Sequence, residues 1–115
     1  MPLHVDAAIG GYVLPFIEME GKYDFKPWDF RVEGVCSINA DTHKYGYSPK
    51  GSSVLIFNSS AIRRYQYFSF ATWPGGIYIS PTAMGTRNGG CISAAWGSLL
   101  GLGVKGFRES TKKIL

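Results

Sequence analysis

The sequence predicts an α/β fold in which a mostly parallel sheet carries one antiparallel strand. Residues 3–6 and 31–40 are two short apolar segments that each end in polar and small residues. Such endings are typical of parallel strands that bring functional groups to the carboxyl edge of a sheet. Residues 52–58 form a third, β-rich segment bounded by glycine and serine, which is the clearest strand of the chain. Residues 93–104 are rich in alanine and leucine and predict a helix.

The first half of the chain connects the first two strands. Residues 7–20 combine small residues with an apolar patch, and Pro15 argues against one continuous helix there. Residues 22–29 predict a loop whose aromatic side chains pack back on the domain. The second strand, with Val35 and Ile38, suits a sheet that is buried on both faces.

The direction of the third strand follows from its connection. Only about a dozen residues without a helical pattern separate it from the second strand, whereas a parallel crossover needs at least that many and usually a helix. We therefore expect an antiparallel pair. After it, Ser59 and Ser60 cap a short helix over residues 61–66.

The second half of the chain has a weaker pattern. Residues 67–90 are rich in aromatic residues and glycine without a period, and predict a long structured loop. In the helix that follows, Gly101, Gly103 and Gly106 loosen the end, and a further helix begins near Lys105.

Two residues at the ends of the first two strands indicate a cofactor. Asp6 ends the first strand, and Lys44 lies in the loop after the second. A loop lysine is commonly a solvated charge, but its amine can also condense with an aldehyde. Pyridoxal phosphate needs this combination, because a lysine holds its aldehyde as a Schiff base while a carboxylate pairs with its protonated ring nitrogen. Alanines after Asp6 would let a flat ring approach the backbone.

The charge distribution indicates an anionic ligand. The chain has a net charge of +4, and residues 1–41 hold seven of its eight acidic residues. Residues 42–108 hold no acidic residue and seven lysines and arginines. A basic field suits a phosphorylated small molecule or a nucleic acid, and the sequence has no nucleic-acid-binding motif. Phosphate groups of a cofactor and a substrate are the better explanation.

The sequence gives little support for a disulfide-rich, metal-binding, membrane-spanning or secreted protein. Cys36 and Cys91 are too few for a disulfide framework and indicate reduced thiols in a reducing compartment such as the cytoplasm. Two cysteines and two histidines spread along the chain do not predict a metal site. No apolar run reaches the roughly 18 residues of a membrane-spanning helix. Residues 1–3 lead straight into the first strand, so we expect no signal peptide.

Several motifs together resemble a known family. His-Val-Asp-Ala-Ala-Ile-Gly-Gly at 4–11 and Ala-Asp-Thr-His-Lys-Tyr-Gly-Tyr-Ser-Pro-Lys-Gly at 40–51 are similar to the group II pyridoxal-phosphate decarboxylase family. Three further segments resemble its sphingosine-1-phosphate lyase branch: residues 30–35, 73–78 and 80–82. The resemblance implies the large domain of fold type I pyridoxal-phosphate transferases. Because those enzymes have several hundred residues, we expect residues 1–115 to be a partial cofactor-binding domain, truncated at both ends.

The resemblance also implies roles for single residues. Lys44 and Asp6 would be the catalytic and cofactor-binding pair, and Ala8 would contact the ring. His43 would lie against the cofactor phosphate, with a histidine satisfied by local backbone as the alternative. Lys50 would bind the substrate phosphate, although a solvated loop lysine is equally plausible.

A third segment would serve a neighbouring subunit. Residues 85–87, Gly-Thr-Arg, resemble a Gly-Ser-Arg stretch that reaches the cofactor phosphate of the other protomer, and Thr86 keeps the hydroxyl donor. Asn88 stands where the family has proline, which puts the stiffness of this loop in doubt.

The activity implied is carbon–carbon cleavage of a phosphorylated sphingoid base, giving a fatty aldehyde and phosphoethanolamine. The resemblance further implies a homodimer, and a parent enzyme that is soluble or anchored in the endoplasmic reticulum with its catalytic part in the cytosol. Two alternatives stay open: an amino-acid decarboxylase of the same group, and a chain that is non-catalytic by itself.

Overall fold

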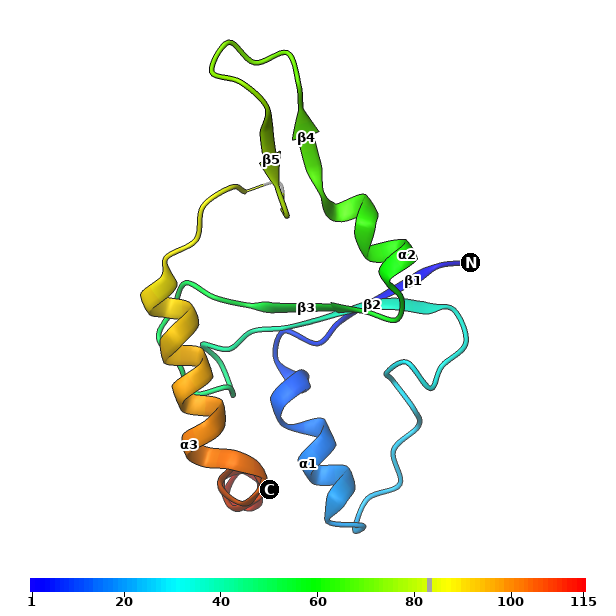
Figure 1. Cartoon of the computed structure of the whole chain (residues 1–115). Coiled ribbons are helices and arrows are strands. Elements are labelled where there is room, and N and C mark those ends of the chain that lie inside the picture. Colours follow the sequence, from blue (N-terminus) through cyan, green and yellow to red (C-terminus); the bar gives the residue numbers. More distant parts are fainter. Residues whose placement is uncertain (83) are drawn as a thin grey trace.

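A three-stranded sheet is the centre of the computed structural model, which describes residues 1–82 and 84–115 (Figure 1). Its strands are β1 (Leu3–Asp6), β2 (Val35–Ala40) and β3 (Val54–Phe57), in the order β1-β2-β3. β1 and β2 are parallel, whereas β2 and β3 are antiparallel. The predicted α/β class and the predicted antiparallel strand are confirmed.

The second strand starts later than the sequence predicts. Residues 31–34 form a turn, in which the Asp29 side chain accepts the backbone N–H of Arg31 at 3.0 Å and the Asp29 carbonyl accepts the N–H of Val32 at 2.9 Å. Gly34 then adopts a φ of +94°, which is unfavourable for other residues. The prediction of a strand over residues 31–34 is therefore wrong, because local hydrogen bonds of Asp29 compete with the sheet.

The two faces of the sheet differ in chemistry, because successive side chains of a strand point to opposite faces. Ile38 pairs with Val5 and Ile56 in the sheet register, and these side chains share an apolar face. The other face, here called the polar face, carries four polar side chains: those of His4, Asp6, Ser37 and Asn39. The predicted burial of β2 on both faces holds only in part, because Ile38 is buried but Ala40 on the same face, and Ser37 and Asn39 on the polar face, are half-buried.

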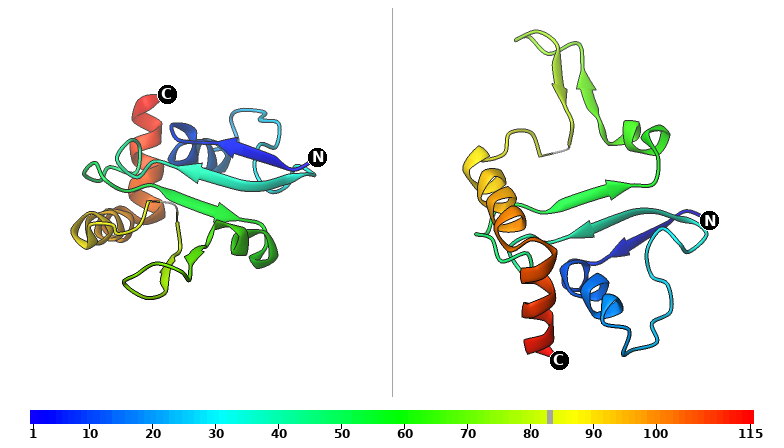
Figure 2. Two further views of the ribbon diagram at one scale, coloured as in Figure 1. Left: turned by 90° about the horizontal axis from the view of Figure 1, so that it is seen from above. Right: turned by 60° about the horizontal axis from the view of Figure 1, so that its bottom comes forward.

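A short helix lies on the apolar side of the sheet, and the long C-terminal helix packs against it. A short 3-10 turn (Gly10–Tyr12) precedes α1 (Leu14–Met19), and Pro15 fits because it lies in the first turn of the helix. α1 lies beside the end of α3 (Gly89–Ile114), as Figure 2 shows. The rings of Phe16 and Phe107 stack with centroids 5.0 Å apart.

Ion pairs complete this helix–helix contact. The Glu20 carboxylate lies 2.8 Å from Arg108 Nε and 3.2 Å from Lys112 Nζ. The kink that the glycines predict in α3 is at Gly103, whose φ of 55° and ψ of −173° are not helical.

The segment after β3 contains an element that the sequence did not predict. Ser59 accepts the N–H of Ile62 at 3.3 Å and caps α2 (Ser60–Arg63), as expected, and a 3-10 turn (Arg64–Gln66) continues it. Then β4 (Phe68–Phe70) and β5 (Tyr78–Ser80) pair antiparallel in a hairpin that projects away from the sheet (Figure 1). The sequence predicted a long structured loop here, and the prediction was wrong in leaving out this pair of strands, which the aromatic residues favour.

No helix within the described residues combines the length and the apolar character needed to cross a membrane.

Candidate active site

The carboxyl ends of β1 and β2 are joined directly by backbone hydrogen bonds. Ala7 N–H donates to the Asn39 carbonyl at 3.1 Å, and Asp41 N–H donates to the Ala8 carbonyl at 3.3 Å. The segment after Asp6 and the loop that carries Lys44 therefore start side by side at one edge of the sheet. The structure brings the two predicted functional loops together.

Asp6 is held as a carboxylate by two donors on the same oxygen. Its Oδ1 accepts the backbone N–H of Ala8 and the Asn39 amide Nδ2, each at 3.1 Å. These two hydrogen bonds lower the pKa of Asp6, with smaller contributions from the charges of His4 and Lys44. Asp6 is consequently ionised at neutral pH, as a partner for a protonated ring nitrogen must be.

Lys44 pairs with a residue to which the sequence gave no role. Its Nζ lies 2.9 Å from Oδ2 of Asp41, while Oδ1 of Asp41 accepts the Ser53 hydroxyl at 2.9 Å. The hydrogen bond from Lys44, followed by that from Ser53, lowers the pKa of Asp41. The spacing of three residues within one loop was the available signal for this pair.

The lysine loop, which we define as residues 41–53 between β2 and β3, has a closely packed backbone. Thr42 is buried and donates its hydroxyl to the Ser52 carbonyl at 2.8 Å. A Cβ on Gly46 would lie 2.5 Å from the Thr42 carbonyl oxygen, so only glycine allows this backbone approach. On the outer side, the Ser98 hydroxyl of α3 lies 3.0 Å from the carbonyl of Gly46 and from that of Tyr47.

A cavity lined by both polar and apolar side chains adjoins the lysine loop through His43. It has a volume of about 730 Å³, and Leu55, the cross-strand partner of Asn39, places it on the side of the polar face. Its polar lining comes from the lysine loop, the 3-10 turn after α2 and the segment before α3: His43, Ser52, Ser53, Gln66, Thr82 and Arg87. The ring of His43 has its Nδ1 3.3 Å from the Ser52 carbonyl and its Nε2 3.8 Å from Oδ2 of Asp41.

Of the other predicted site residues, some lie beside Asp6 and Lys44 and others do not. Ala8 is half-buried between the two loops, where its N–H binds Asp6 and its carbonyl binds Asp41. Lys50 and Thr86 are exposed and do not line the cavity. The structure therefore gathers Asp6, Ala8, His43 and Lys44, and leaves Lys50 and Thr86 outside this group.

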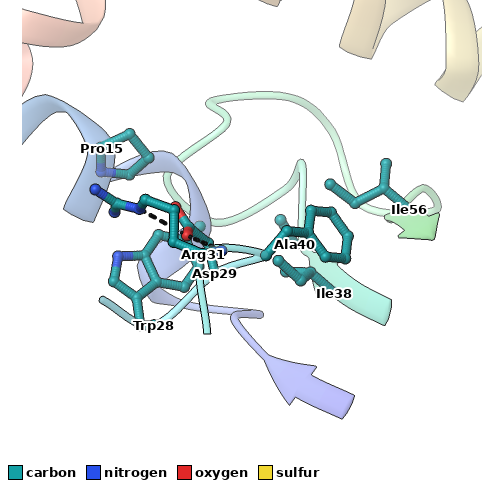
Figure 3. A pocket seen from close by; sticks show the side chains of 9 residues that line it. Pro15, Trp28, Asp29, Arg31, Ile38, Ala40 and Ile56 are labelled. Carbon is teal, nitrogen blue, oxygen red and sulfur yellow. Dashed lines mark hydrogen bonds and ion pairs between the residues drawn. The ribbon is translucent and has the colours of Figure 1, made fainter. Parts of the chain in front are cut away.

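A second cavity lies on the opposite face of the sheet. It measures about 490 Å³ and lies between Ile38, Ala40 and Ile56 of the sheet and the segment that holds Trp28 and Arg31 (Figure 3). Its lining is apolar apart from the ion pair of Arg31 with Asp29, at 2.8 Å. It is separated by the sheet from Asp6, so it is not part of the candidate active site.

The residues at the polar face fit pyridoxal phosphate. A fixed carboxylate and a primary amine lie at adjacent strand ends, and Asp6 Oδ2 accepts no hydrogen bond within the described part of the chain. The nearby cavity offers the imidazole of His43, the guanidinium of Arg87 and several hydroxyls to an anionic group. The residues that the structure describes include no group of three potential metal ligands.

Comparisons with known proteins show what the chain is similar to. No family model matches the chain. The sphingosine-1-phosphate lyase 1 of Rattus norvegicus is 52% identical over 115 residues, which are 100% of this chain and 20% of the rat protein. The solved structure of a sphingosine-1-phosphate lyase from Burkholderia pseudomallei matches with a TM-score of 0.93 and 48% identity, over 99% of this chain and 26% of that one.

A decarboxylase is a more distant neighbour. The glutamate decarboxylase of Lactobacillus brevis matches with a TM-score of 0.75 and 32% identity, over 98% of this chain and 24% of that one. Both solved structures confirm the mixed α/β fold. The chain spans about a fifth of the length of its curated relatives, and it belongs to the sphingosine-1-phosphate lyase family.

Proposed function

We propose that the chain carries the cofactor-anchoring centre of a pyridoxal-phosphate-dependent aldehyde-lyase. Its substrate would be a phosphorylated sphingoid base, which is cleaved to a fatty aldehyde and phosphoethanolamine. The observation that carries the proposal is the juxtaposition of Asp6 and Lys44 at the neighbouring ends of β1 and β2. The names of the relatives support the substrate class.

Each of the two residues has a separate task. Pyridoxal phosphate, when bound, supplies a ring that takes up the electron pair of the broken carbon–carbon bond. Asp6 would keep the ring nitrogen protonated, because its own pKa is lowered and it remains a carboxylate. Lys44 would hold the cofactor by condensation of its amine with the aldehyde, which releases water and requires the amine to leave Asp41 and lose a proton. Asp41 therefore holds the amine in place until the cofactor arrives.

The phosphate groups would use the basic surroundings. We assign the cofactor phosphate to the cavity of His43 and Arg87, whose side chains can donate hydrogen bonds to an anion. Lys50, outside this cavity, would bind the substrate phosphate. Thr86 would serve the cofactor phosphate of a second protomer in a homodimer. The chain would form part of the cofactor-binding domain.

The amino-acid decarboxylase is the second candidate. The same lysine and aspartate would serve it, and the Lactobacillus structure supports it. Its lower identity and TM-score make it the weaker candidate.

The test is reductive labelling with pyridoxal phosphate. The purified chain is incubated with the cofactor and reduced with borohydride, and the modified peptides are mapped by mass spectrometry. We expect the label on Lys44, its loss in Lys44→Met, and a strong decrease in Asp6→Ala. Matched controls are Lys105→Met, since Lys105 is a solvent-exposed lysine, and Asp24→Ala, since Asp24 is an exposed acid; both should keep the label on Lys44.

The results separate the candidates. Label spread evenly over the exposed lysines would refute the cofactor site. With Lys44 labelled, release of fatty aldehyde from a phosphorylated sphingoid base supports the lyase, whereas release of carbon dioxide from an amino acid instead supports the decarboxylase. Label on Lys44 with neither product would limit the function of this chain to cofactor attachment.

A further inference from the structure

The polar face of the sheet carries a continuous line of hydrogen-bonded side chains that ends at Asp6. Ser37 Oγ lies 2.8 Å from His4 Nδ1, His4 Nε2 lies 3.0 Å from Asn39 Oδ1, and Asn39 Nδ2 donates to Asp6 Oδ1 at 3.1 Å. The register of the parallel pair produces this line, because His4 is opposite Ser37 and Asp6 is opposite Asn39.

We propose that His4 and Asn39 are positioning residues that hold Asp6 in one orientation, with Oδ1 bound by the protein and Oδ2 left for the cofactor ring nitrogen. The proposal rests on the proposed function for the identity of that ring. Neither residue was assigned a role by the sequence motifs. Both residues act through Asp6. In the described part of the chain, neither side chain forms a hydrogen bond to the lysine loop.

The charge of Asp6 determines the orientation of the Asn39 amide. A carboxylate accepts hydrogen bonds and cannot donate them, so the NH2 group of Asn39 must face Asp6. The amide oxygen then faces His4 Nε2 at 3.0 Å. A rotated amide would set its oxygen against the carboxylate of Asp6, which is repulsive.

The amide in turn determines the tautomer of His4. Because Asn39 Oδ1 only accepts, His4 must carry a proton on Nε2. Its Nδ1 faces the Ser37 hydroxyl, which can donate to a neutral imidazole or accept from a charged one. The line therefore stays fully hydrogen-bonded in both charge states of His4, and the Asn39 donor remains fixed on Asp6.

The arrangement leaves one oxygen of Asp6 available. Oδ1 receives both the Asn39 amide and the Ala8 backbone N–H. The charged groups that act on Asp6 are His4 on its own strand and Lys44 from the neighbouring loop. Without Asn39, the carboxylate keeps only the Ala8 bond and can turn about its χ2 angle, so neither oxygen is reserved.

The first experiment is independent of the cofactor. The Asp6 carboxyl is titrated by carbon-13 NMR in the chain and in two variants, Asn39→Leu and Asn39→Asp. We expect its pKa to rise in Asn39→Leu, and to rise further in Asn39→Asp, where two adjacent carboxyls share a proton. Asn58→Leu is the matched control, because Asn58 also donates its amide, but to the Val35 carbonyl away from Asp6.

The second experiment measures cofactor binding. Asn39→Leu should weaken the affinity for pyridoxal phosphate about tenfold, since one hydrogen bond to a charged group is lost. His4→Phe should weaken it less, and His4→Gln should restore it, because the glutamine amide can still donate to Asn39 Oδ1. The nitrogen-15 NMR spectrum of a bound cofactor labelled at its ring nitrogen reports the protonation of that nitrogen directly.

The outcomes distinguish this inference from the proposed function. An unchanged Asp6 pKa in Asn39→Leu overturns the positioning role, whatever the cofactor does. A raised pKa with unchanged affinity and spectrum also overturns it, because Asp6 orientation would then not matter to the ring. The unmodified chain could also show the lowered pKa of Asp6 and yet bind no pyridoxal phosphate. The hydrogen bonds from His4 to Asp6 would then be confirmed, whereas their role in binding a cofactor ring would be refuted together with the proposed function.

Discussion

Replacing Gly46 by alanine tests whether the close packing of the lysine loop is needed for its function. The Cβ of an alanine would lie 2.5 Å from the Thr42 carbonyl oxygen and 2.8 Å from Thr42 Cα. Ordinary contacts of a Cβ begin at about 3.4 Å, so the backbone of residues 42–46 must move by about 0.9 Å. Both obstructing atoms belong to the backbone, and no flexible side chain can turn away.

The free energy that this movement costs depends on which part of the lysine loop can move. Thr42 is buried and fixed to Ser52, so the loop yields by moving its outer part, which contains Lys44. Overpacking of this kind costs about 1–3 kcal/mol of unfolding free energy. We therefore expect the Lys44–Asp41 contact to be broken in Gly46→Ala, together with the selective labelling of Lys44.

The assay combines urea unfolding with reductive labelling by pyridoxal phosphate. Gly97→Ala is the matched control, because Gly97 lies in α3 and its added Cβ would meet nothing within 4 Å beyond its chain neighbours and the nearby backbone of its own helix. Alanine in a helix interior should leave labelling unchanged and stabilise the chain by up to about 1 kcal/mol. If Gly46→Ala is as stable as the unmodified chain and keeps its label on Lys44, the steric argument is refuted.

Two further predictions concern the contact of α1 with α3. Phe107 is 3% exposed, so Phe107→Ala should lower the free energy of unfolding in urea by about 3–5 kcal/mol. Trp96 is 64% exposed, so Trp96→Ala should change that free energy little. Equal effects of the two substitutions would contradict the assignment of Phe107 to the core. The hydrogen bond from Arg108 and, less strongly, that from Lys112 lower the pKa of Glu20 in the folded chain. The ionised Glu20 therefore stabilises the fold above its ordinary pKa of 4.5, and this stabilisation is lost as the pH falls through the lowered pKa of the folded state. Stability measured against pH should therefore fall less steeply in acid for Glu20→Gln, and an unchanged acid profile would refute this contribution.

Local sequence signals predicted much of the fold. A short apolar segment ending in Asp6 predicted β1, a β-rich run bounded by glycine and serine predicted β3, and the short connection predicted that β3 is antiparallel to β2. Ser59 as a helix cap and Gly103 as a kink are also local effects, because each depends on the hydrogen bonds or the φ angle of a few residues.

Elements that depend on distant partners were not predicted. The β4–β5 hairpin forms because two short aromatic segments pair across a loop, and neither shows a clear strand pattern alone. The late start of β2 results from the Asp29 side chain, which captures the backbone before the sheet does. Asp41 likewise gained its role only from the position of its carboxylate beside Lys44.

By itself, the sequence determined which chemical groups are available: a carboxylate at Asp6, an amine at Lys44, and an imidazole at His43. Spacing along the chain also placed the first two at strand ends. The tertiary structure decided which atoms face one another, because Asn39 and Asp6 are 33 residues apart in the sequence and their hydrogen bond requires the register of two strands. Register is set by the packing of the apolar face, and the order of residues alone does not contain it.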